Sequence, residues 1–438
     1  MAGDSREERA VACRSRSPRG VQTVPQHADE CLEAKQDVTA SVDATVETVE
    51  NAAAAGDVQT AATAANVDMG NNRGNKCAPD AYDDIVHFDW HEGMMLDSRY
   101  KLERLLGDGA FGRVVLAKDQ KDKQEVAIKI IRDVKRYVEH AKVEAAILDD
   151  IRKADADGSS RCVIMHSSFT HSSTYFCMVF EPLGQSLYDF LKWNGFRGFW
   201  LQDIQSFAKQ SLQALNFLHT RLQCTHTDLK PENILLESAE VARVSFFPRA
   251  EFQPPCEEYA RLPYVRPASN SIKLIDFGNA TYIDMHHAKV ISTRQYRAPE
   301  VILQMEWSEH ADIWSLSCIL MELYRGQLLF ETHDSLEHLA LMEQILGPFP
   351  LAMLARAGSK AKKKYITASV DGLKWPDAAP TEESVWHVAH QWRLSELAPP
   401  EHLAFTNFIG SLLTAEPARR PDATQALEDP FLSLTFNE

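Results

Sequence analysis

The apolar positions after Tyr100 fall into short runs rich in β-branched residues, a pattern typical of consecutive antiparallel strands. One longer segment among them, Tyr137–Lys153, instead has helical spacing through Val143, Ala146 and Ile147. The pattern therefore predicts a small sheet with one helix. The predicted strands are Tyr100–Leu106, Arg113–Ala117, Glu125–Ile131, Val163–Met165 and Tyr175–Phe180.

After Gly184 the pattern becomes mostly helical, with apolar residues recurring every 3.6 positions. No internal repeat is visible. A second, helical lobe is therefore predicted. Its helical segments are Ser186–Trp193, Gln202–His219, Ala311–Tyr324, Ser335–Leu346 and Glu401–Leu413.

The N-terminal segment lacks both patterns. From Met1 to about Asp80 it contains no Phe, Trp, Tyr or Ile, and Leu32 is its only leucine. Such a segment cannot bury enough apolar surface to offset the entropy of ordering it. The predicted organisation is a disordered low-complexity tail over 1–83 and a folded domain over 84–434, with an N-lobe over 84–183 and a C-lobe over 184–434.

Composition narrows the class of protein. The chain has 438 residues and is 45% hydrophobic, enough for one large or two-lobed globular unit. Its formal net charge of -16 argues against general affinity for nucleic acid or anionic membranes and favours basic partners. The eight cysteines include no C-x-x-C pair, so we expect reduced cysteines in the cytosol or nucleus.

We expect no membrane span and no secretory signal. The most apolar long window, Ala311–Phe330, is interrupted by Asp312, Glu322 and Arg325. The N-terminus has no apolar segment of the kind that heads a secreted protein.

The loop His226–Asn233 is the first candidate for chemistry. It places a carboxylate (Asp228), a cation (Lys230) and a metal-binding amide (Asn233) within one loop, which suits phosphoryl transfer. A polar loop holding these residues by coincidence is the alternative. The choice depends on matching parts elsewhere in the chain.

A glycine-rich segment supplies one such part. Gly107, Gly109, Gly112 and Val114 fit the pattern G-x-G-x-x-G-x-V, in which missing side chains let backbone N–H groups approach phosphate oxygens. A dinucleotide-binding turn would lead into a helix, whereas a strand-like run follows here. This favours a hairpin lid over ATP, with an ordinary glycine hairpin as the alternative.

Lys129 lies inside a strand that looks buried, where an unpaired ammonium would be costly. Glu144, on the predicted helix, can supply its carboxylate and leave Lys129 to hold the α- and β-phosphates. Taken alone, Glu144 would be an ordinary glutamate on a solvated helix face.

Another candidate motif for phosphoryl transfer follows the strand-like run Ile272–Ile275, where Asp276 begins the triplet Asp-Phe-Gly. We expect Asp276 to chelate Mg²⁺ between the β- and γ-phosphates and Asn233 to hold a second ion. The triplet precedes Ala-Pro-Glu, whose Glu300 is a candidate buried partner of Arg420.

In this order, the motifs resemble the eukaryotic protein kinases. The resemblance implies an α+β fold with a small antiparallel-sheet N-lobe and a larger helical C-lobe, and ATP and Mg²⁺ as cofactors. It also implies that Thr293 contacts the catalytic base and Lys230, as in serine/threonine kinases.

The resemblance also implies an adenine site between the two lobes. The adenine would lie between Leu106, Val114 and Ala127 above and Leu235 below. It would form hydrogen bonds with the backbone of Glu181 and Leu183, which follow a bulky gatekeeper residue, Phe180.

A closer resemblance comes from Glu337–Pro348, which is similar to the E-H-L-A-M-M-E-R signature of the LAMMER, or Clk-type, kinases. Leu341 and Gln344 depart from that signature. The matching region runs from about Asp84 to Leu434.

Kinases of this type are dual-specificity enzymes of the CMGC group, usually nuclear, which phosphorylate Ser/Thr in Arg/Ser-rich proteins and autophosphorylate on Tyr. The resemblance implies a nuclear, monomeric enzyme with basic or Arg/Ser-rich protein substrates. The tail contains only one Arg/Ser run, Arg14–Arg19, which makes splicing-factor substrates less certain. A Pro-directed CMGC kinase and a catalytically dead scaffold are the alternatives; intact Lys129, Asp228, Asn233 and Asp276 argue against the scaffold.

Three further features depart from the usual kinase pattern or extend it. Thr227 replaces the arginine whose charge is often neutralised by phosphate on the activation loop, so we expect the dephosphorylated enzyme to stay active. Ser317 replaces a helical glycine, which we expect the packing to tolerate. The run 237–271 lies where the family carries an extra hairpin, and a disordered insert is the alternative.

Overall fold

The computed structural model of the chain describes residues 88–244 and 264–436, which lie within one compact unit. The predicted tail, 1–83, lies outside the described residues, as does the middle of the predicted insert. No helix within the described ranges is long and apolar enough to cross a membrane.

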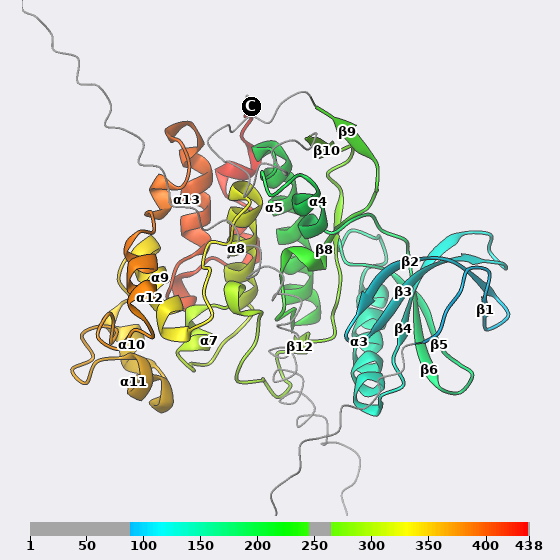
Figure 1. Cartoon of the computed structure of the whole chain (residues 1–438), viewed down its shortest axis with the longest axis horizontal. Helices are drawn as coiled ribbons and strands as arrows, with labels where there is room; N and C mark the ends of the chain where they lie inside the picture. The colour runs from blue at the N-terminus through cyan, green and yellow to red at the C-terminus, as the bar shows by residue number, and fades with distance from the viewer. Residues whose placement is uncertain (1–87, 245–263, 437–438) are drawn as a thin grey trace, which may run out of the picture. The chain divides into compact units, whose positions relative to one another are not determined.

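The N-lobe is built on a six-stranded antiparallel sheet with the order β1-β2-β3-β4-β6-β5 (Figure 1). Four of the five predicted strands are confirmed, but Val163–Met165 is wrong. The fifth strand begins only at Met165, because the Val163 N–H donates to Leu274 O at 2.9 Å in the C-lobe. The strands are Met95–Leu96 (β1), Tyr100–Gly109 (β2), Gly112–Asp119 (β3), Glu125–Ile131 (β4), Met165–His171 (β5) and Tyr175–Phe180 (β6).

Strand register decides which side chains face the C-lobe. Val114 lies opposite Lys129, and Ala127 lies opposite Phe180. Because directly paired residues of an antiparallel ladder share a face, these four side chains lie on one side of the sheet. Their neighbours along the strands, such as Val115, point to the other side and form a separate core with Phe88, Leu96 and Tyr100.

The N-lobe helix, α3 (Lys135–Ala154), is confirmed, and its buried face includes the predicted Ile147 but not the predicted Val143 and Ala146. Val143 is 55% exposed and Ala146 is also exposed, whereas Glu144 and Ala145 are buried. The stripe that faces the sheet contains the charged Glu144, and hydrophobic spacing cannot detect a buried glutamate.

The C-lobe is helical, and the five predicted helices are confirmed within three residues at each end. A π-helical turn, Phe217–Leu222, follows α5, and the short helices α7, α10, α11, α12 and α14 were not predicted. The helices are Leu187–Trp193 (α4), Leu201–Asn216 (α5), Pro299–Ile302 (α7), His310–Arg325 (α8), Ser335–Leu346 (α9), Leu351–Arg356 (α10), Ser359–Tyr365 (α11), Glu382–Ala389 (α12), Leu403–Leu412 (α13) and Ala423–Ala426 (α14).

Three two-stranded ladders join the irregular parts of the C-lobe. Strands β9 and β10 pair at the two sides of the predicted insert, as a hairpin requires, while residues 245–263 between them lie outside the described residues. The ladders are β7 (Cys224–Thr225) with β12 (Thr281–Tyr282), β8 (Ile234–Leu236) with β11 (Ile272–Leu274), and β9 (Val241–Arg243) with β10 (Val265–Pro267).

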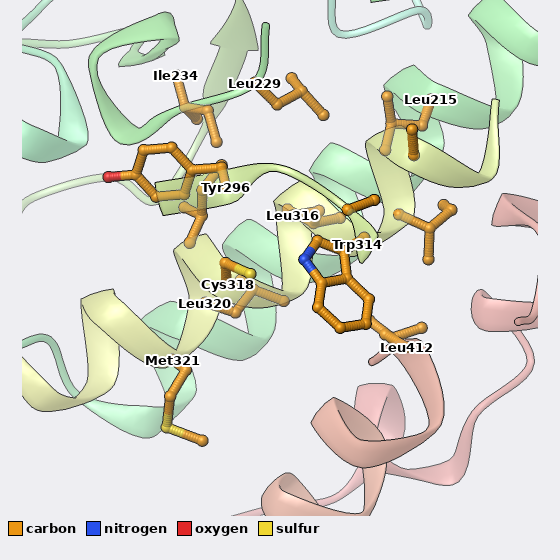
Figure 2. Close-up of a cluster of buried hydrophobic side chains, with 14 of the residues drawn as sticks. Leu215, Leu229, Ile234, Tyr296, Trp314, Leu316, Cys318, Leu320, Met321 and Leu412 are labelled. Atoms are coloured by element: carbon orange, nitrogen blue, oxygen red, sulfur yellow. The ribbon is translucent and has the colours of Figure 1, made fainter. Parts of the chain in front are cut away.

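Helix α8 is the centre of the lobe's packing. Leu229 lies within the predicted catalytic loop, Ile234 directly follows it and Tyr296 lies shortly before Ala-Pro-Glu, and all three belong to the same buried cluster as Trp314 of α8 (Figure 2). Ser317 of α8 is buried and donates its hydroxyl to Trp314 O at 2.7 Å, so the packing accommodates it as expected.

The predicted Glu300–Arg420 pair is confirmed. Arg420 donates from Nη1 and Nη2 to the two carboxylate oxygens at 2.8 and 2.9 Å, and both side chains are 0% exposed. The same guanidinium also donates to His310 O and Thr414 O and lies over the Trp314 ring. The pair therefore ties the end of the activation segment to α8 and the C-terminal region.

Arg420→Ala is expected to lower the free energy of unfolding by about 3–5 kcal/mol, because it leaves Glu300 buried without a counter-charge. The measurement is urea unfolding. Arg419→Ala, at an exposed neighbour, is the control and should change stability by no more than about 0.5 kcal/mol. Similar losses for the two variants would contradict the prediction.

Candidate active site

Lys129 and Glu144 meet as predicted. Lys129 Nζ donates to both carboxylate oxygens of Glu144, at 2.9 and 2.8 Å, and lies 3.7 Å from Asp276 Oδ1. Burial by itself would lower the pKa of Lys129, but the two carboxylates outweigh it, and the pKa stays raised above its usual value. The ammonium is therefore charged and held at the boundary between the lobes.

Asp276 is placed by an unusual backbone conformation. Its φ is 64°, in the left-handed region that non-glycine residues rarely adopt. Phe277 is fully buried, with its ring 5.2 Å from the ring of His226. Although burial opposes it, the positive charges of Lys129 and Lys230 lower the pKa of Asp276, so its carboxylate stays ionised.

The predicted catalytic loop forms one hydrogen-bonded cluster around Asp228. Its Oδ1 accepts from Thr293 N at 3.1 Å and Thr293 Oγ1 at 2.8 Å, and its Oδ2 accepts from Lys230 Nζ at 3.1 Å. Asn233 Nδ2 donates to Asp228 O at 2.9 Å. The structure thus brings together Asp228, Lys230, Thr293 and Asn233, as the sequence predicted.

Asp312, near the start of α8, anchors this loop through hydrogen bonds to its backbone. Its buried carboxylate accepts the backbone N–H of His226 at 2.8 Å and of Thr227 at 2.9 Å, and it also contacts His219 Nε2 at 2.9 Å. Sequence reasoning missed this role and treated Asp312 only as an interruption of an apolar window. A buried acid inside an apolar helix is the signal that could have found it, since such an acid needs donors.

Thr227 joins the catalytic loop to the Asp-Phe-Gly segment. Its φ is 68°, and its hydroxyl donates to Asn279 O at 2.7 Å. The side chain is buried and carries no charge, so it offers no attraction to a phosphate on the activation loop. That the enzyme is active without loop phosphorylation stays a prediction.

The predicted adenine site lies between the sheet and β8. Val114, Ala127 and Phe180 share the face that carries Lys129. Leu235 lies in β8 beside the linker between the lobes, residues 181–184, where Gly184 N donates to Leu236 O at 2.7 Å. Leu106 is partly exposed at the end of the β2 apolar run. That these residues line an adenine pocket stays a prediction.

The linker leaves backbone groups available for an adenine. The Glu181 carboxylate is turned away and accepts from Lys273 Nζ at 2.5 Å and from Ile164 N at 2.8 Å. Within the described ranges, no backbone acceptor is bonded to the Leu183 N–H. Lys273, three residues before Asp276, was not predicted; it connects the linker to the strand that carries Asp276.

The three glycines of the predicted lid serve different needs. A Cβ at Gly112 would lie 2.1 Å from Ile130 O, so glycine there is required by the close approach of β3 and β4. A Cβ at Gly107 would meet nothing within 4 Å, and one at Gly109 only Gly112 O at 3.7 Å. Gly107 and Gly109 thus leave open space for a ligand, while Gly112 is structural.

The residues predicted to bind metal fit Mg²⁺. Asn233 uses its amide nitrogen on the backbone of Asp228, which leaves its side-chain oxygen for a ligand, and Asp276 presents an ionised carboxylate. The described part of the chain contains no group of three or more His, Cys, Asp or Glu side chains arranged for a metal. Two oxygen ligands, with the rest from phosphate and water, match the way Mg²⁺ is usually bound.

Comparison with known proteins now defines the class. A family model described as "Protein kinase domain" matches residues 100–432. A crystal structure of a kinase domain superimposes with a TM-score of 0.74 at 39% identity, covering 80% of this chain and 100% of that one. The chain belongs to the protein kinase family.

The relatives of the chain show which group of protein kinases it resembles. Serine/threonine-protein kinase AFC2 of Arabidopsis thaliana is 40% identical over 79% of this chain and 80% of the relative. Dual specificity protein kinase CLK1 of Homo sapiens is 40% identical over 80% of this chain and 69% of the relative. The predicted grouping with the LAMMER, or Clk-type, kinases is confirmed.

Thr227→Val should lower kcat several-fold, because it removes the 2.7 Å hydrogen bond from this side chain to Asn279 O and leaves that carbonyl only the longer 3.3 Å bond from the Thr281 hydroxyl, at a cost of about 0.5–1.5 kcal/mol. Steady-state kinetics with a peptide substrate and thermal unfolding measure the two effects. Thr225→Val is the control: Thr225 is buried in β7, and its hydroxyl has no hydrogen bond to other described residues. Equal loss of kcat in both variants would contradict this role of Thr227.

Proposed function

We propose that this protein transfers the γ-phosphate of ATP to Ser or Thr of basic, Arg-containing protein substrates, in the nucleus. The observation that carries the proposal is the cluster around Asp228, whose carboxylate is held by Thr293 and Lys230 beside the Lys129–Glu144–Asp276 group. The charged side chains that phosphoryl transfer needs are present and already paired.

The side chains divide the work of the reaction. Asp228 Oδ1 is aligned by Thr293 to orient or accept the proton of a substrate hydroxyl, and Lys230 neutralises charge on the transferred phosphoryl group. Lys129 would hold the α- and β-phosphates, with Glu144 fixing its position. Mg²⁺ bound at Asp276 and Asn233 would offset the phosphate charge.

A basic substrate fits the acidic groups beside the catalytic loop. Glu232 Oε2 is buried, and it has no hydrogen-bond partner within the described ranges. Burial raises the pKa of Glu232, and the nearby exposed Asp189 raises it further. A substrate guanidinium would pair with Glu232 and remove the cost of leaving its buried oxygen without a donor, while Asp189, whose carboxylate accepts the Ser186 hydroxyl at 2.6 Å, would add a second negative charge. Glu232 lies inside the predicted loop, but sequence reasoning assigned it no role.

A preference for proline directly after the phosphoacceptor is a second candidate, favoured by Arg297. Its guanidinium donates to Ile291 O at 2.9 Å and to Ser292 O at 2.9 and 3.2 Å. These carbonyls precede Thr293, where the substrate backbone would pass, so the next substrate residue would find no free acceptor for its N–H. Proline has no N–H to satisfy.

The relatives named above include serine/threonine and dual-specificity kinases. We propose Ser/Thr as the main acceptors and autophosphorylation on Tyr as a secondary activity. The contact between Thr293 and Asp228 supports the first part.

Asp228→Asn is expected to reduce phosphate transfer to an Arg/Ser peptide by about 10²–10⁴-fold, because the hydroxyl loses its proton acceptor. Radiolabelled ATP provides the measurement. The matched control is Asp371→Asn, at an exposed carboxylate in the turn after α11, which should keep wild-type activity. Wild-type protein with no more transfer than Asp228→Asn would instead indicate a kinase-fold scaffold.

Glu232→Gln should raise KM for peptides with arginine near the phosphoacceptor by about tenfold, since it weakens a charge-assisted hydrogen bond worth about 1.5–3 kcal/mol. A peptide panel varying arginine and the following proline measures this. Peptides without arginine should be unaffected, as should the exposed control Glu240→Gln.

In the same panel, a gain from proline with no gain from arginine would favour the Pro-directed kinase. A gain from arginine that survives Glu232→Gln would contradict the role given to Glu232.

A further inference from the structure

Helix α12 presents an almost entirely exposed face. Val388 is its only buried residue, and the helix packs beside α9. Trp386 is 62% exposed, and Trp392, just after the helix, is 63% exposed. Large aromatic side chains left this exposed on a folded domain often mark an interaction site.

The exposed face combines aromatic and acidic groups. Glu382 and Glu383 lie one helical turn before Trp386, and His390 lies one turn after it, so all four share one side of the helix. The Trp386 and His390 rings stack at 4.0 Å. Across the structure's described ranges, neither glutamate has an ion-pair partner, so both carboxylates are available.

The segment is held firmly against the rest of the lobe. Gln344 of α9 donates to Gln391 O at 3.0 Å, and Arg393 Nη1 donates to Glu343 O at 3.2 Å. Gln344 is one of the two departures from the family signature. The aromatic and acidic groups therefore stand on a rigid support, which lowers the entropy cost of binding.

We propose that Glu382, Glu383, Trp386, His390 and Trp392 form a docking surface for arginine side chains of the protein substrate, separate from the catalytic site. A planar guanidinium can stack on an indole while donating to a carboxylate one turn away. The net charge of the chain, -16, disfavours acidic partners and matches a basic one.

The inference rests on the proposed preference for Arg-containing substrates and extends it to residues far along the substrate from the phosphoacceptor. Each exposed contact contributes little, so several arginines must bind together. A long Arg-rich substrate would gain from this surface, and a short peptide would not.

The test uses the full-length chain and two substrates: a short phosphoacceptor peptide, and the same peptide extended by an Arg-Ala repeat without acceptors. In the Trp386→Ala/Trp392→Ala double variant, KM for the extended substrate should rise roughly fivefold or more. The KM for the short peptide and both kcat values should stay unchanged.

The Glu382→Gln/Glu383→Gln double variant should also raise the KM for the extended substrate, and the rise should be larger at low salt.

Two controls match these changes. Leu351→Ala removes an exposed apolar side chain from α10, and Glu428→Gln removes an exposed carboxylate near the C-terminus. Both should leave the KM for the extended substrate unchanged. Equal effects of the control and test variants, or equal effects on the two substrates, would overturn the proposal.

Calorimetric titration of the Arg-Ala repeat alone measures docking without catalysis, so it separates failure of docking from failure of the proposed function. Binding should weaken in the tryptophan variant. An equally tight Lys-Ala repeat would overturn recognition of arginine. Sedimentation tests whether a second copy of the chain covers this surface. A dimer of the wild-type protein that becomes a monomer in the tryptophan variant would show this and overturn the proposal.

Discussion

The carboxylate of Asp312 is the constraint on which the active site depends. It lies at the start of a buried helix and accepts two successive backbone N–H groups of the catalytic loop, His226 and Thr227. A buried carboxylate is costly without donors, and buried N–H groups are costly without acceptors, so each stabilises the other. The catalytic loop is therefore anchored to the buried helix α8, and this anchoring fixes the position of Asp228, which follows Thr227 in the loop.

Two further connections extend this framework. Thr227 joins the loop to Asn279, just after the Asp-Phe-Gly segment, and Lys273 joins the strand before that segment to the linker between the lobes. Asp276 lies between these two connections and faces Lys129 across the lobe boundary. Mostly uncharged or fully paired contacts hold the arrangement.

Much of this site could be predicted because its residues are close in sequence and their chemistry is distinctive. Asp228, Lys230 and Asn233 lie in one loop, and Lys129 in a buried strand required a carboxylate. Asp312, Lys273 and Glu232 could not be assigned in the same way. Each acts through a partner chosen by folding, and a lone charged residue in sequence usually belongs to a solvated surface.

The sequence by itself determined the two-lobed fold, the chemistry of the loop and the family, because apolar periodicity and ordered motifs are local properties. Only the tertiary structure decided which face of α3 is buried, since the glutamate inside that face is stabilised by Lys129 from another element. It also decided that Trp386 of α12 and Trp392 just after it stay exposed instead of joining the core. Burial depends on what packs against a residue, and spacing along the chain does not specify the partner.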